Sequence, residues 1–103
     1  MPKAKYQINL TEAAEQDLTE IVDYIADENP LSALKVIVRI EKNIQKLEDF
    51  PLMGVVPRIR RLARKGYRIL IVEDYLIFYV IIDNEIIEIR RILSGKRDYQ
   101  FVF

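Results

Sequence analysis

The fold is decided by one stretch, residues 66–99, which reads GYRILIVEDYLIFYVIIDNEIIEIRRILSGKRDY. It contains three apolar runs, Tyr67 to Val72, Leu76 to Ile82 and Ile86 to Leu93, separated only by short polar breaks. Runs of this length that are rich in Ile, Val, Tyr and Phe predict strands, and the short breaks predict tight hairpins between them. The stretch therefore predicts a three-stranded antiparallel meander.

The middle run has no polar alternation, which predicts a central strand with both faces covered. The third run alternates, and one face of it is predicted to carry Ile87, Ile89, Arg91 and Leu93, the other Ile86, Glu88, Arg90 and Ile92. The third run and the turn after it place four cations at one corner of the sheet: Arg90, Arg91, Lys96 and Arg97. We expect the functional end of the molecule at this corner.

The residues before the meander predict a strand followed by a helical hairpin. A weak alternation over residues 5–10 indicates an edge strand, and Thr11 is a suitable N-cap for a helix that runs to about Glu28. Asn29-Pro30 starts a second amphipathic helix, which stops at Phe50-Pro51. The outward face of the first helix is predicted to be solvated and purely acidic: Glu12, Glu15, Asp17, Glu20, Asp23, Asp27 and Glu28.

The order of these elements predicts an α+β fold, β-α-α-β-β-β, as a single domain over residues 1–103. A helical hairpin would cover one face of a mostly antiparallel sheet. This order excludes an RNA-recognition motif, which needs a strand between its helices, and a double-stranded RNA domain, which has a helix at each end of its sheet.

The composition excludes several kinds of chemistry. The chain has no Cys and no His, so thiolate catalysis is absent and the usual transition-metal ligands are missing. We expect no metal and no cofactor. No apolar run approaches the roughly 18–20 residues that cross a bilayer, so we expect a cytoplasmic protein without a membrane partner.

The net charge is zero, from 16 basic and 16 acidic residues, but the charges are unevenly distributed. Residues 1–57 carry six Lys or Arg against ten Asp or Glu, whereas residues 58–103 carry ten against six. The segment at residues 58–65 is densely basic, and its pattern does not decide between helix and strand. The asymmetry indicates one electronegative and one electropositive surface, unless the two halves neutralise each other across a packed interface.

These elements and several local motifs resemble the RelE/ParE toxins of bacterial type II toxin–antitoxin systems. The motifs are Asp17-Leu18, Tyr24-Ile25, Asn29-Pro30, Phe50-Pro51, Arg68, Tyr75 to Tyr79, and Ile89 to Leu93 running into Gly95 to Tyr99. The resemblance covers nearly the whole chain. It implies the fold inferred above and a growth-arresting toxin that a cognate antitoxin neutralises.

The resemblance leaves two activities open, and the choice decides whether the protein is an enzyme. RelE-like toxins cut messenger RNA on the ribosome with basic side chains that stabilise the negative charge developing on the phosphoryl group during transfer. ParE-like toxins inhibit DNA gyrase. The motifs Tyr75 to Tyr79 and Arg97-Asp98-Tyr99 are closer to the ParE pattern, and zero net charge favours the same branch, because ribosomal RNA is bound through many phosphate contacts. We expect gyrase as the target; the alternatives are ribosome-dependent messenger cleavage and a non-toxic binding module or decayed toxin.

Carried over residue by residue, the resemblance makes Arg68, Arg97 and Tyr99 the catalytic candidates. Arg68 stands at a functional Lys of RelE-like toxins, Arg97 at a functional Arg, and Tyr99 near a C-terminal aromatic. Leu70 and Leu76 replace two further basic residues, and no His is present to act as a base. The competing interpretation of Arg68 is a structural ion pair with a nearby carboxylate.

Partner contacts are expected on two surfaces. The residues expected to bind the target are Arg91, Lys96 and Arg97. Arg91 is preferred to Arg90 because Glu88 lies two residues from Arg90 on the same face. Exposed apolar segments and the basic run supply the expected antitoxin contacts: Leu52, Val55, Val56, Arg58, Arg61, Phe101 and Phe103. DNA would be reached only through the antitoxin complex.

Overall fold

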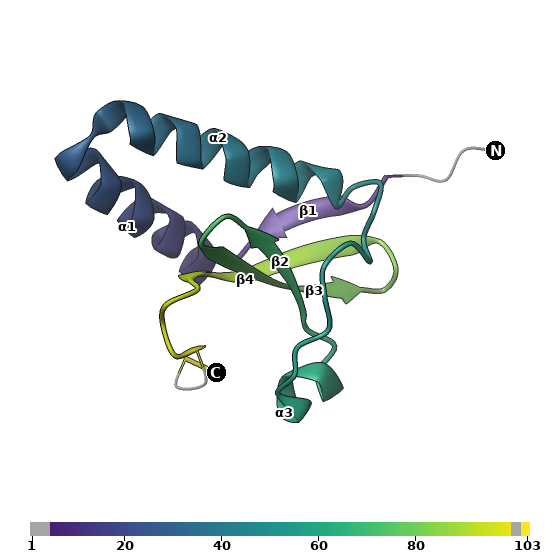
Figure 1. Cartoon of the computed structure of the whole chain (residues 1–103). Coiled ribbons are helices and arrows are strands. Elements are labelled where there is room, and N and C mark those ends of the chain that lie inside the picture. The colour runs from purple at the N-terminus through teal and green to yellow at the C-terminus, as the bar shows by residue number, and fades with distance from the viewer. Residues whose placement is uncertain (1–4, 100–101) are drawn as a thin grey trace.

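The computed structural model describes residues 5–99 and 102–103 and has the predicted order of elements (Figure 1). The elements are β1 (Gln7–Leu10), α1 (Glu12–Glu28), α2 (Pro30–Lys46), α3 (Arg60–Arg64), β2 (Arg68–Val72), β3 (Tyr75–Ile82) and β4 (Ile86–Ser94). The short helix α3 supplies the structure of the basic segment that the sequence pattern left open. Phe101, an expected antitoxin contact, lies outside the described residues.

The four strands form one sheet in the order β1-β4-β3-β2. The meander pairs antiparallel throughout, whereas β1 pairs parallel with β4 from Gln7 opposite Ile86 to Leu10 opposite Ile89. The prediction of a mostly antiparallel sheet with β1 at its edge is therefore confirmed. The strand β1 is only four residues long, so it covers only the first half of β4.

The helical hairpin begins and turns where its capping residues predict. Thr11 Oγ1 accepts a hydrogen bond from the Ala14 N–H at 3.1 Å, and Asn29 Oδ1 accepts one from the Ser32 N–H at 3.2 Å. Pro30 occupies the first turn of α2, where its missing N–H leaves no bond unmade. The two helices lie side by side across one face of the sheet (Figure 1).

Apolar side chains fill both faces of the sheet. The core between the sheet and the helices includes Ala14, Ile40, Ile44, Leu47, Ile77, Tyr79, Ile89 and Ile92. The opposite face is covered by α3 and the C-terminal residues, and its core consists of Leu62, Tyr67, Ile69, Phe78, Val80 and Leu93. The strand β3 contributes to both cores, as its uninterrupted apolar sequence predicts.

A β-bulge at Arg90 changes which face each residue of β4 presents. Tyr79 pairs with Ile89, and the preceding Phe78 pairs with Arg91, so Arg90 has no partner position on β3. The extra residue shifts the alternation beyond it. Ile92 therefore joins the helix-side core with Ile89, and the predicted assignment of Ile92 to the other face was wrong.

Candidate functional site

The exposed edge of β4 beyond β1 is completed by side chains of the first helix. Thr11 Oγ1 donates to the Arg90 carbonyl at 3.0 Å, and Asp17 Oδ2 accepts from the Ile92 N–H at 3.0 Å. These two bonds satisfy backbone groups that a longer β1 would otherwise have paired. The N-terminal half of α1 therefore takes the place of a neighbouring strand along the part of β4 that β1 does not reach.

Asp17 also forms a bidentate salt bridge with Arg91. Arg91 Nε donates to Asp17 Oδ2 at 2.6 Å, and Nη2 donates to Oδ1 at 2.8 Å. These hydrogen bonds, more than any other influence, raise the pKa of Arg91. Asp17 is only 7% exposed, so its prediction as part of a solvated face was wrong. The sequence did indicate this burial: Asp17 lies three residues after Ala14 and four before Ile21, so it is at the edge of the apolar face of the helix.

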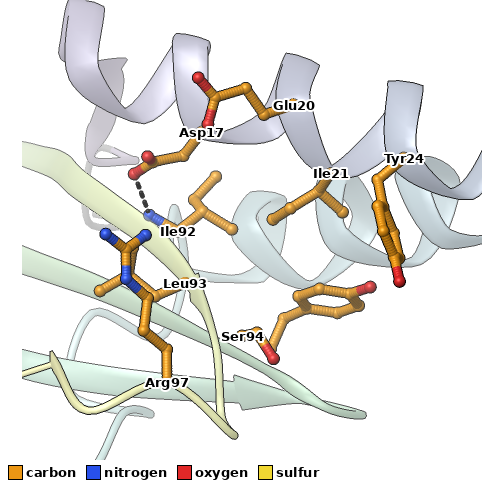
Figure 2. A pocket seen from close by; sticks show the side chains of 9 residues that line it. Asp17, Glu20, Ile21, Tyr24, Ile92, Leu93, Ser94 and Arg97 are labelled. Atoms are coloured by element: carbon orange, nitrogen blue, oxygen red, sulfur yellow. Dashed lines mark hydrogen bonds between the residues drawn. The ribbon is translucent and has the colours of Figure 1, made fainter.

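A cleft opens beside this ion pair, between α1 and the ends of β3 and β4. Its volume is about 240 Å³, and its walls are Asp17, Glu20, Ile21, Tyr24, Tyr75, Ile92, Leu93, Ser94 and Arg97. Figure 2 shows Arg97 directed toward Asp17 at one end, whereas Tyr24 lies further along α1. The cleft thus combines an apolar floor with aromatic and charged walls, which is the general make-up of a binding site.

Two of the cations expected at one corner of the sheet, Arg91 and Arg97, are both directed toward Asp17 (Figure 2). Arg97 lines the cleft, and Lys96 is exposed in the same turn. Arg91 is bound to Asp17, so its charge is already paired within the chain. Arg68 lies at the other end of the meander, opposite Tyr79 on β3, whereas Arg97 follows the end of β4, where Ser94 is opposite Tyr75.

Arg68 holds a loop instead of facing a carboxylate. Its Nη1 donates to the Gly54 carbonyl at 2.7 Å and to the Leu52 carbonyl at 3.3 Å. The acids that could have been its partners are engaged elsewhere: Glu88 pairs with Arg90 at 2.8 Å, as predicted, and Glu73 pairs with Arg39. Arg90 also lies 5.5 Å from the centre of the Tyr67 ring.

The loop that Arg68 holds is apolar and exposed. Tyr79 is buried beneath it; its hydroxyl donates to the Pro51 carbonyl at 2.7 Å and accepts from the Gly54 N–H at 2.9 Å. A Cβ atom at Gly54 would lie 2.7 Å from that hydroxyl, so only glycine fits. Above this support the loop exposes Phe50, Leu52, Met53, Val55 and Val56.

The C-terminal aromatics pack on the sheet face opposite the helices. The Phe78 ring centre lies 5.1 Å from that of Tyr99 and 4.8 Å from that of Phe103. Arg61 Nη1 donates to the Phe103 carbonyl at 3.1 Å, which ties α3 to the end of the chain. Tyr99 is therefore placed as a packing residue, on a different face of the sheet from Arg68, whose neighbour Tyr79 belongs to the helix-side core.

Sequence reasoning missed Asp17, Glu20 and Tyr24 as residues of the cleft. In the sequence, Tyr24 stands out only as part of a family-like motif. The available signal was an aromatic residue among the carboxylates of the first helix, and the structure shows that this residue is 76% exposed.

Comparisons with known proteins agree with this fold. The family model of the ParE toxin of type II toxin–antitoxin systems, parDE, matches residues 8–99. A structure of the chromosomal ParDE toxin–antitoxin system from P. aeruginosa is 23% identical and has a TM-score of 0.70; the match covers 87% of this chain and 96% of that chain. The toxin–antitoxin complex RelBE2 from Mycobacterium tuberculosis is 25% identical, with a TM-score of 0.62 and 87% and 98% coverage.

Two further findings bear on the assignment. No curated protein matched the sequence. Among residues 5–99 and 102–103, none of the helices combines the length and the apolar character that a membrane span requires. Because the family model spans nearly the whole chain and the fold agrees, this chain belongs to the ParE toxin family of type II toxin–antitoxin systems.

Proposed function

We propose that this toxin arrests bacterial growth by inhibiting DNA gyrase and that a cognate antitoxin neutralises it. The family model that matches residues 8–99 describes ParE toxins, and the similar structures are of toxin–antitoxin systems. The proposal that the target is a protein, and not RNA, draws its main support from the arrangement of the cations.

The observation that carries the choice of target is the internal pairing of Arg91 with Asp17. A ribonuclease of this type needs several basic groups converging on one phosphate. Here Arg91 is neutralised by a carboxylate, Arg68 donates to loop carbonyls, and Tyr99 packs against Phe78. Only Arg97 and Lys96 remain as exposed cations of the expected group, and Arg97 shares its cleft with Asp17 and Glu20. Such a mixed surface suits contacts with a protein better than contacts with a polyanion.

We expect the antitoxin to bind the exposed apolar loop and the basic segment beside it. Leu52, Val55 and Val56 form an apolar surface that Arg68 and Tyr79 hold in place, and Arg58 follows two residues after Val56. An antitoxin segment that is both apolar and acidic would match this surface. Arg61 and Phe103 already bind each other. They would therefore contact the antitoxin only at the edge of this surface, or after Phe103 is released from Arg61.

Replacing Leu52 by aspartate is expected to weaken antitoxin binding by at least about tenfold, because an apolar anchor would become a desolvated charge. Leu31→Asp, at an apolar position on α2 that is 71% exposed against 63% for Leu52, is the matched control and should leave the affinity unchanged. Calorimetry on the purified pair measures both affinities. If both variants weaken binding equally, or neither does, the loop is not the antitoxin site.

Controlled expression in a bacterium tests the proposed target. The toxin should stop growth and reduce the negative supercoiling of a reporter plasmid, while primer extension on translated messengers finds no new 5′ ends. New 5′ ends that disappear in the Arg97→Ala variant would establish the messenger-cleaving alternative instead. Normal growth with soluble protein present would favour a non-toxic binding module.

A further inference from the structure

Tyr24 is an exposed aromatic on a helix that carries acids and no bases. The sequence of α1 is EAAEQDLTEIVDYIADE, and Tyr24 is 76% exposed on it. Carboxylates lie one helical turn before and after Tyr24, at Glu20 and Glu28, where side chains four residues apart are neighbours. Burial therefore does not account for this ring, and its surroundings are electronegative.

Tyr75 gives the same cleft a second aromatic wall. It begins β3 and follows directly on Glu73 and Asp74. Burial is the main cause that raises the pKa of Tyr75, and the charges of Asp74 and Glu73 raise it further. The negative potential at this end of the cleft is thus felt at the Tyr75 hydroxyl. Arg97, by contrast, is directed toward Asp17 (Figure 2).

The wall formed by β4 offers one main-chain N–H to a ligand. The Ile92 N–H is directed away from β3, because it donates to Asp17. Strand geometry then places the Ser94 N–H on this same side, beyond the end of β1 and facing the cleft that Ser94 lines. A carbonyl of an extended peptide could accept a hydrogen bond from it, in the way that a strand adds to a sheet edge.

We propose that this cleft binds an arginine side chain, presented on an extended segment of the toxin's protein target. The guanidinium plane would stack on the tyrosine rings with its charge facing Glu20, and the methylene stem would pack on Ile21. The segment's main chain would meet Ser94. This inference rests on the proposed function in one respect only, the identity of the partner as the target.

This cleft differs in charge from the surface that is proposed to bind the antitoxin. The loop and the segment at residues 58–65 are apolar and basic, whereas the outward face of α1 is acidic. A nucleic acid would bring phosphates against Glu20, which is unfavourable. A basic protein segment is the ligand that the charges of α1 favour.

The arginine site is tested first by NMR with N-acetyl-L-arginine-N-methylamide as the probe. The ring signals of Tyr24 and Tyr75 should shift saturably at millimolar concentrations, and the norleucine analogue, which lacks the charge, should give shifts several times smaller. Tyr24→Ala should abolish the response, Tyr24→Phe should keep it, and Glu20→Gln should weaken it severalfold. Glu12→Gln, an exposed acid on the same helix outside the cleft, is the matched control. No saturable shift, equal shifts with norleucine, or a stronger response to uridine monophosphate would overturn the proposal.

The identity of the partner is tested with gyrase and antitoxin in parallel. Tyr24→Ala should raise the toxin concentration that half-inhibits supercoiling by at least tenfold and leave antitoxin affinity unchanged, whereas Leu34→Ala, an exposed apolar position on α2, should change neither. If Tyr24→Ala weakens antitoxin binding instead, or leaves inhibition intact, the assignment to the target is wrong. If the unmodified toxin does not inhibit gyrase at all, the proposed function fails, and the NMR result still decides the arginine site.

Discussion

Replacing Asp17 by asparagine is expected to lower the free energy of unfolding by about 3 kcal/mol, a large effect for a change of one polar group. The change removes the negative charge that holds Arg91 and disturbs the acceptor of the Ile92 N–H. The loss falls at the lower end for a broken buried ion pair, because 26% of the Arg91 side chain is exposed and the freed cation can reach water. Urea unfolding followed by circular dichroism measures the change.

A matched control and a double variant make this prediction specific. Asp23→Asn makes the same chemical change at an exposed position on the same helix and should alter stability by less than about 0.5 kcal/mol. Combining Asp17→Asn with Arg91→Met should recover part of the loss, since no unpaired charge remains. Additive effects of the two substitutions would show that the pair contributes nothing as a pair.

Replacing Tyr79 by phenylalanine is expected to cost about 1–3 kcal/mol and to loosen the apolar loop. The Tyr79 hydroxyl is the partner of both the Pro51 carbonyl and the Gly54 N–H, and Phe would leave these groups unbonded beneath the loop. Tyr24→Phe, at an exposed ring, should leave stability within about 0.5 kcal/mol of the original value. Hydrogen exchange at Gly54 should accelerate in the Tyr79 variant only; unchanged exchange would mean that the loop does not depend on this hydroxyl.

The pKa of Tyr79 also predicts that the protein loses stability at alkaline pH. Burial is the main cause that raises the pKa of Tyr79 above its ordinary value of 10.0, although the Gly54 hydrogen bond and Arg68 act in the opposite direction. The folded chain therefore favours the neutral phenol. Its contribution to stability is complete below pH 10 and is lost as the pH rises through the higher folded pKa. Stability measured at pH 8 and above pH 10 should thus fall more steeply for the original protein than for Tyr79→Phe, and parallel curves would contradict this.

Local signals along the chain were sufficient to predict most of the fold. The hairpin follows from Thr11 and Asn29-Pro30, whose caps act within a few residues. The meander follows from long apolar runs with short breaks, and the central position of β3 follows from its lack of polar residues. These features depend on neighbours in sequence, so one sequence is enough to infer them.

The site was harder to predict because it depends on contacts between distant residues. The bulge at Arg90 moves Ile92 to the other face of the sheet, and alternation alone cannot anticipate an inserted residue. The pairing of Asp17 with Arg91 joins α1 to the last strand, and it gives a cation that was expected to bind the target a partner within the chain. The resemblance to a toxin family indicated the general function, but it did not indicate which of the basic residues remain accessible.

We propose that this toxin acts on DNA gyrase through protein contacts and does not cut RNA. The most direct test is an assay in which purified gyrase supercoils relaxed plasmid DNA in the presence of increasing amounts of the purified toxin. We expect concentration-dependent inhibition that an equimolar amount of the cognate antitoxin reverses. Full supercoiling at saturating toxin, together with cleavage of messenger RNA when the same preparation is added to translating ribosomes, would contradict the claim.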